Sequence, residues 1–228
     1  MAGSFEDIRA ILLEEGATLV GFADMTAIPV EERKGMPRAL SIAVALDPGI
    51  VTRIAQGPTP EYFREYGRAN AILSALAHRA EGLLKERGFE AAALEPTTEA
   101  FDAVRLRAGL SHKIAATRSG LGWIGKTDLL VSRRFGPRVR LASILTDLPL
   151  EPLDAPIDES RCGSCSLCVD ICPAGAATGE PWNTGMHRDR FFDAFRCREY
   201  CRSISKQRLN RAISLCGKCV HICPGGRA

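Results

Sequence analysis

The sequence has 228 residues, of which 46% are hydrophobic and 25% charged, and its formal net charge is +3. This length suits one large domain or two smaller ones, and so small a charge does not by itself indicate a nucleic-acid or membrane partner. The chain has no run of about eighteen apolar residues, so no membrane span is predicted. The N-terminus has neither a basic n-region nor a twin arginine, and we therefore expect a cytoplasmic protein without a secretory signal.

Helix and strand patterns alternate over the first 150 residues. Ser4 is a suitable N-cap for the first helix, and Thr59 followed by Pro60 marks the start of the longest one. Asp47-Pro48-Gly49 is a turn by its chemistry. Predicted helices cover residues 4–15, 59–87 and 111–119, and predicted strands cover residues 18–22, 39–46, 91–94, 128–132 and 139–146. The alternation predicts an α/β (α+β) domain with a mixed sheet over residues 1–150.

Cysteine usage changes abruptly along the chain. None of the nine cysteines precedes Cys162, and a proline-containing stretch with Pro149, Pro152 and Pro156 is typical of a linker just before them. Nothing indicates the oxidising compartment that a disulfide framework would need. We therefore expect a second, small, α-rich domain over residues 158–228, built around these thiols.

Two cysteine motifs indicate the cofactor. Cys162-Gly-Ser-Cys165-Ser-Leu-Cys168-Val-Asp-Ile-Cys172-Pro173 has the spacing of the bacterial ferredoxin run, in which the fourth cysteine binds the second cluster. A shorter copy, Cys216-Gly-Lys-Cys219-Val-His-Ile-Cys223-Pro224, follows near the C-terminus. The pair predicts a bacterial ferredoxin-like domain with two [4Fe–4S] clusters. Structural zinc and simple buried thiols are the disfavoured alternatives.

The crossing of the fourth cysteine assigns most of the ligands. One cluster takes Cys162, Cys165, Cys168 and Cys223, whereas the other takes Cys172, Cys216 and Cys219 and needs one ligand more. Cys197 and Cys201 lie four residues apart on a predicted helix and face the same side, so spacing does not choose between them. His221, inside the second motif, is expected beside the ligands and not among them.

A glycine-rich stretch, Gly120-Leu-Gly122-Trp123-Ile-Gly125-Lys126, lies between the two regions. Its spacing fits neither a P-loop nor a dinucleotide-binding fingerprint. Together with Asp128-Leu-Leu-Val, Thr146-Asp147-Leu148-Pro149-Leu150 and the Cys162 motif, it resembles the epoxyqueuosine reductase family. Those enzymes remove the epoxide oxygen of epoxyqueuosine in tRNA, with a cobalamin in an N-terminal α/β domain and two [4Fe–4S] clusters behind it. The resemblance covers about residues 36–226.

The resemblance implies roles for particular residues. Asp193-Ala194-Phe195-Arg196-Cys197 matches the family's Asp-Ala-x-Arg-Cys, which makes Cys197 the eighth cluster ligand. The residues that would line the corrinoid site are Gly120, Gly122, Trp123, Gly125, Lys126, Leu130 and Leu141. The 228 residues do not include the C-terminal region that many members of the family have.

The family's proton donor is an aspartate in an Asp-Ser-Ala-Pro segment, and it has no match here. Counting back without gaps places Leu106-Arg107-Ala108-Gly109 at that segment. Glu95, Glu99 and Asp102 are candidates to replace it, although a solvated carboxylate is the favoured interpretation for each. His112, which precedes the glycine turn, is a further candidate, against the favoured interpretation of a surface histidine.

Three hypotheses for function follow from these patterns. The first is a reductase that takes electrons from a ferredoxin- or flavodoxin-type donor and passes them from the clusters to a corrinoid or substrate in the N-terminal domain. The second is a non-enzymatic electron carrier or activator that docks on another enzyme. The third is tRNA binding through arginines at positions 133–140 and 202–211, for which solvated charge is the favoured alternative.

Overall fold

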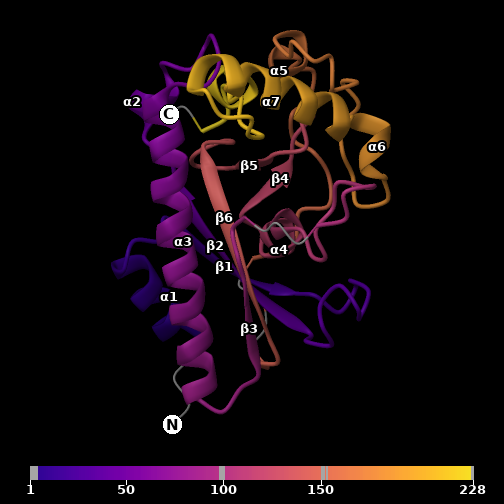
Figure 1. Ribbon diagram of the computed structural model, residues 1–228. Helices are drawn as coiled ribbons and strands as arrows, with labels where there is room; N and C mark the ends of the chain where they lie inside the picture. The colour runs from indigo at the N-terminus through magenta and orange to yellow at the C-terminus, as the bar shows by residue number, and fades with distance from the viewer. Residues whose placement is uncertain (1–4, 98–100, 150–151, 153, 227–228) are drawn as a thin grey trace. The chain divides into compact units, whose positions relative to one another are not determined.

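The computed structural model describes residues 5–97, 101–149, 152 and 154–226 (Figure 1). The helices are α1 (Phe5–Glu14), α2 (Pro48–Val51), α3 (Pro60–Glu86), α4 (His112–Arg118), α5 (Leu167–Asp170), α6 (Arg188–Phe191), α7 (Ala194–Leu209) and α8 (Lys218–Ile222). The strands are β1 (Leu19–Asp24), β2 (Arg38–Ala45), β3 (Ala91–Leu94), β4 (Gly122–Ile124), β5 (Leu130–Ser132) and β6 (Val139–Thr146). None of the helices within these ranges has the length and apolar character needed to cross a membrane.

The chain forms two compact units that interleave in sequence. Unit 1 comprises Met1–Ala45, Ala69–Leu121 and Arg140–Ile157, and unit 2 comprises Leu46–Arg68, Gly122–Val139 and Asp158–Ala228. This division differs from two successive segments over residues 1–150 and 158–228. Two stretches of the N-terminal segment belong to the same unit as the cysteines.

Unit 1 is built on a four-stranded sheet with the order β1-β2-β6-β3. β1 pairs antiparallel with β2, and β3 pairs antiparallel with β6. In Figure 1, α1 and the Ala69–Glu86 part of α3 lie on one side of this sheet and α4 lies on the other. Because helices cover both faces, residues 39–43 of β2 are all buried, which explains their continuous apolar pattern.

The start of α3 shows how sequence specifies an element. Thr59 accepts a hydrogen bond from the backbone N–H of Tyr62 at 3.2 Å through its hydroxyl oxygen, as an N-cap does. Pro60 occupies the first helical position, where its missing N–H is not needed. The predicted cap and helix are therefore confirmed. Ser4, the predicted cap of α1, lies outside the described residues.

Two short elements differ from the sequence prediction. Asp47-Pro48-Gly49, predicted as a turn, starts helix α2, because the Asp47 carboxylate accepts a hydrogen bond from the backbone N–H of Ile50 at 2.9 Å. The glycine-rich stretch contains strand β4, because Gly122, Trp123 and Ile124 pair with β5. Both differences arise from contacts that a local pattern does not reveal.

Unit 2 combines the β4–β5 hairpin with α2, the start of α3, and helices α5 to α8 around the cysteines. Its apolar core gathers Ile124, Ala176, Trp182, Phe191 and Phe192, with Cys172 and Cys197 packed against them. The predicted α/β class with a small α-rich cysteine region is thus confirmed.

Candidate metal centre

All nine cysteines are free thiols, and they all belong to unit 2. The first group comprises Cys162, Cys165, Cys168 and Cys223. Cys168 lies on α5 and Cys223 directly after α8. Burial raises the pKa of Cys168 to about 11, and the neighbouring sulfurs of Cys162, Cys223 and Cys165 add to this effect. The structure therefore gathers the four thiols that sequence reasoning assigned to one cluster.

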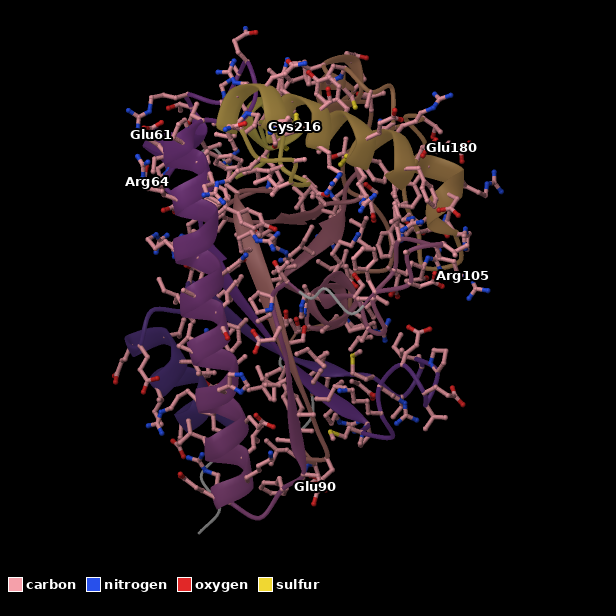
Figure 2. The ribbon with its side chains drawn as sticks, in the orientation of Figure 1. Glu61, Arg64, Glu90, Arg105, Glu180 and Cys216 are labelled. Atoms are coloured by element: carbon pink, nitrogen blue, oxygen red, sulfur yellow. The ribbon has the colours of Figure 1, made fainter. Side chains whose placement is uncertain are left out.

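The second group is built around helix α7. Cys197 and Cys201 both lie on this helix, and their sulfur atoms are 3.8 Å apart. Cys216, labelled in Figure 2, lies beside them, since its thiol hydrogen-bonds with that of Cys201. This hydrogen bond lowers the pKa of Cys216 to about 7, whereas burial raises the pKa of Cys219 to about 12.

Cys172 completes the second group. It packs against the same apolar core as Cys197. Burial raises the pKa of Tyr200 on α7, and the nearby thiols of Cys216, Cys201 and Cys172 add to this effect. The second group therefore has five thiols and the first has four.

The donor set fits iron–sulfur clusters, which bind through cysteine thiolates. Thiols held together with raised pKa values, such as Cys168 and Cys219, keep their protons until a metal displaces them. Among the described residues, no three His, Cys, Asp or Glu side chains are close enough to hold a single metal ion.

The β4–β5 hairpin provides direct contacts to the first cysteine run. The indole N–H of Trp123 donates a hydrogen bond to the Cys162 sulfur at 3.4 Å. Lys126 is only 6% exposed, and its ammonium group donates to the backbone carbonyls of Gly163 and Cys165, each at 3.0 Å. These two side chains hold the loop that carries the first thiols.

Sequence reasoning did not identify two further supports of the cysteines, Thr127 and Arg138. The hydroxyl of Thr127 hydrogen-bonds with Cys168 and with Cys219, and so contacts both groups of thiols. The guanidinium of Arg138 donates to the carbonyls of Cys223 and Gly225. No sequence pattern marks an arginine that binds backbone carbonyls, as Arg138 does. Thr127 follows a glycine turn, and a threonine at such a position is common.

His221 lies beside the ligands. Its ring nitrogen Nδ1 donates to the backbone carbonyl of Val51 at 3.0 Å, which joins α8 to α2 within unit 2. This placement agrees with a supporting role, as its sequence position suggested.

The residues that the resemblance implied for a corrinoid site divide between the two units. Gly120 and Leu141 belong to unit 1, whereas Gly122, Trp123, Gly125, Lys126 and Leu130 belong to unit 2. A Cβ atom at Gly120 would lie 2.5 Å from the Cβ of Asp154, and one at Gly125 would lie 2.8 Å from a methyl group of Val131. These glycines permit close packing of protein against protein. A corrinoid site lined by these seven residues stays a prediction.

The candidate proton donors within the described residues have structural partners in unit 1. The ring of His112 contacts the Ser143 hydroxyl at 3.0 Å through Nδ1, and Nε2 donates to the Glu95 backbone carbonyl at 2.9 Å. Burial lowers the pKa of His112. The Glu95 carboxylate accepts from Ser74 and contacts His78, each at 2.8 Å, and the Ser74 hydrogen bond lowers its pKa.

Asp102 caps a surface turn. Its carboxylate accepts from the backbone N–H groups of Val104 and Arg105 at 2.8 and 3.0 Å. Glu99 lies outside the described residues. The described candidates are thus engaged in local structure, and a catalytic role for any of them stays a prediction.

Several arginines considered for tRNA contact hold the protein together. Arg140 donates to Asn70 at 3.0 Å, Arg208 donates to the Pro58 carbonyl at 3.0 Å, and Arg211 lies over the Phe63 ring at 5.5 Å. With Arg138, these residues have internal partners, which weakens the case for a phosphate-binding surface made of these stretches.

Comparison with known proteins defines the class of this region. Residues 161–226 match the family model described as a 4Fe-4S double cluster binding domain. This range contains all nine cysteines, and the cysteine-rich part of the chain is therefore a domain of that class.

Sequence similarity to individual proteins extends beyond this domain. Over 211 residues the chain is 31% identical to an epoxyqueuosine reductase of Pseudomonas aeruginosa. The aligned region covers 87% of this chain and 54% of the relative. The chain thus spans about half the length of this curated relative. The predicted resemblance to epoxyqueuosine reductases is confirmed.

Solved structures share the fold. A catabolic reductive dehalogenase, NpRdhA, in complex with 3-bromo-4-hydroxybenzoic acid matches with a TM-score of 0.74 and 21% identity, over 98% of this chain and 32% of that chain. An epoxyqueuosine reductase with an epoxyqueuosine-modified tRNA-Tyr stem loop matches with a TM-score of 0.64 and 20% identity, over 98% of this chain and 65% of that chain.

Proposed function

We propose that this protein is an iron–sulfur reductase in which two [4Fe–4S] clusters supply electrons to a bound acceptor. The observation that supports this most strongly is the gathering of nine free thiols into two groups, inside the range that matches a double-cluster family. The proposed ligands are Cys162, Cys165, Cys168 and Cys223 for the first cluster, and Cys172, Cys197, Cys216 and Cys219 for the second.

The protein's own contribution is to hold the thiolates and to set the reduction potential of the clusters that they bind. Trp123 and Thr127 donate hydrogen bonds to cysteine sulfurs, and such bonds stabilise the more negative, reduced state. The buried side chain of Lys126 donates to two backbone carbonyls of the first cysteine run and so holds its loop in place.

The proposed substrate is an epoxide-bearing nucleoside in tRNA. Curated relatives are named epoxyqueuosine reductases, and one structural neighbour is in complex with an epoxyqueuosine-modified tRNA stem loop. The same resemblance implies a corrinoid, which when bound would supply a low-valent cobalt centre. A ferredoxin- or flavodoxin-type protein is the proposed source of the electrons.

The test uses anaerobically reconstituted protein, a low-potential reductant and an epoxyqueuosine-modified tRNA stem loop, with and without added cobalamin. We expect mass spectrometry to show the loss of one oxygen atom from the modified nucleoside. Cys165→Ala, which removes one proposed ligand of the first cluster, is the matched control and should abolish turnover. An unchanged stem loop with both clusters loaded and cobalamin present would contradict the reductase proposal.

Electrons could pass from the clusters to the substrate through cobalamin or directly. Absorbance spectra recorded after gel filtration of the same samples separate these two routes. Cobalamin that stays with the protein through gel filtration supports the corrinoid route. Turnover without retained cobalamin supports direct reduction of the substrate.

An electron carrier without its own substrate is the second candidate. The observation that favours it is the engagement of His112, Glu95 and Asp102 in local structure, which leaves none of these three as an uncommitted proton donor. This candidate predicts that a partner protein reoxidises the reduced clusters while the stem loop stays unchanged. Turnover of the stem loop by the isolated protein would exclude it.

A further inference from the structure

The second thiol group contains one cysteine more than a cluster needs. A [4Fe–4S] cluster takes about four thiolates, yet Cys172, Cys197, Cys201, Cys216 and Cys219 gather at this position. The first group has no such surplus, since the neighbours of Cys168 there are Cys162, Cys165 and Cys223. The ninth cysteine therefore lies in the second group, and two clusters do not account for it.

Cys201 is placed as a ligand would be. It is 7% exposed, and its sulfur is 3.8 Å from that of Cys197, which is close to contact between two sulfur atoms. Its thiol also hydrogen-bonds with that of Cys216. Residues four apart on a helix lie one above the other on the same face, so α7 presents both cysteines to the same partners.

The helix that carries the two cysteines is fixed at both ends. At its N-terminus the Asp193 carboxylate accepts from the backbone N–H groups of Phe195 and Arg196, each at 3.0 Å. Towards its C-terminus the Ser205 hydroxyl donates to the carbonyl of Leu215 at 2.5 Å, directly before Cys216. These hydrogen bonds hold α7 in place, with both cysteines on it.

We propose that Cys201 is an interchangeable ligand of the second cluster, able to take the place of Cys197 when that thiolate is lost. The proposal rests on the double-cluster function proposed above. The bond exchanged is one iron–thiolate bond for another, so the oxidation state does not change, and the proton of the incoming thiol passes to the outgoing thiolate or to solvent.

The experiment compares iron and sulfide content and electron paramagnetic resonance spectra of anaerobically reconstituted, full-length variants. Cys197→Ala is expected to keep about eight iron atoms per chain, with a changed spectrum for the second cluster. Adding Cys201→Ala to it should lower the content to about four. A loss of half the iron in Cys197→Ala alone would overturn the proposal, and so would full iron in the double variant.

Two controls separate this proposal from the double-cluster function itself. Wild-type protein with fewer than about eight iron atoms would contradict that function and not the exchange. Cys165→Ala belongs to the group without a spare thiol and should lose its cluster, whatever the role of Cys201.

A second variant covers the case in which Cys197→Ala does not fold. Cys197→Ser keeps the size of the side chain, and the proposal predicts a spectrum in which all ligands of the second cluster are sulfur. A spectrum with the signature of an oxygen ligand, or a lost signal, would overturn the exchange.

Discussion

Hydrogen bonds to cysteine sulfurs are one way in which single residues of this protein can tune the reduction potential of the proposed clusters. The Trp123 N–H donates to the sulfur of Cys162, and the single Thr127 O–H can donate to the sulfur of either Cys168 or Cys219. A donor of this kind stabilises the additional negative charge of the reduced state and raises the reduction potential.

Replacing Trp123 by Phe removes the N–H and keeps most of the aromatic surface. We expect the reduction potential of the first cluster to fall by about 40 mV, which corresponds to about 1 kcal/mol for one hydrogen bond. An anaerobic redox titration followed by electron paramagnetic resonance measures this change. Trp182→Phe, in the apolar core of unit 2, is the control, and an equal fall in both variants would show that the indole N–H has no special effect.

At the scale of elements, helix α7 connects local capping to ligand placement. The Asp193 side chain accepts from two backbone N–H groups in the first turn, and Cys197 follows in the same turn of the helix. Fraying of this turn would therefore displace a proposed ligand directly.

Asp193→Ala is expected to destabilise the protein by about 1 kcal/mol, as loss of an N-cap does. The second cluster should also release its iron to a chelator faster than in the wild type, which absorbance can follow with time. Asp193→Asn keeps an oxygen acceptor and should behave nearly as the wild type. Equal rates in the alanine variant and the wild type would contradict the role given to this cap.

His112 makes the stability of unit 1 depend on pH. Burial lowers the pKa of this histidine in the folded state, where its ring contacts Ser143 and the Glu95 carbonyl and lies near the charge of Arg140. Above about pH 6.5 the ring is neutral in both states and its contribution is complete. As pH falls below that value, the unfolded state takes up the proton more readily, and stability is lost.

We expect the free energy of unfolding to fall by at most about 1.4 kcal/mol per pH unit in this range because of His112. The measurement is the difference in thermal midpoint between anaerobic wild type and His112→Gln at pH 8 and at pH 5.5. The wild type should lose more of its stability than the variant on acidification. Parallel losses would show that His112 does not titrate as described.

Sequence patterns predicted the long elements well because those elements carry their own signals. The helix at 59–87 and the strands at 39–46, 91–94 and 139–146 match α3, β2, β3 and β6 closely. Strand β4 was missed because three residues show no periodicity, and its pairing with β5 decides its conformation. The ferredoxin spacing predicted both thiol groups, whereas Lys126 and Arg138 bind backbone carbonyls, for which no sequence signal exists.

At the scale of the whole molecule, the unit that contains the cysteines is not one continuous segment of the chain. Unit 2 includes Leu46–Arg68 and Gly122–Val139 besides the C-terminal segment. These stretches supply Trp123, Lys126 and Arg138, which support the cysteine loops. We therefore expect the folding of these N-terminal stretches and the binding of the clusters to be coupled.

A fragment of residues 158–228 tests this coupling. Because it lacks the contacts of the β4–β5 hairpin and of Val51, we expect it to retain less iron after anaerobic gel filtration than the full chain does. Equal retention would show that the C-terminal segment folds and binds its clusters independently.

The central proposal is that the thiols of unit 2 hold two [4Fe–4S] clusters. The most direct measurement is analysis of iron, acid-labile sulfide and zinc in the anaerobically reconstituted full chain, together with electron paramagnetic resonance of the reduced sample. We predict about eight iron and eight sulfide per chain, with the signals of two interacting reduced clusters. Stoichiometric zinc with no sulfide, or iron for a single cluster only, would contradict the account.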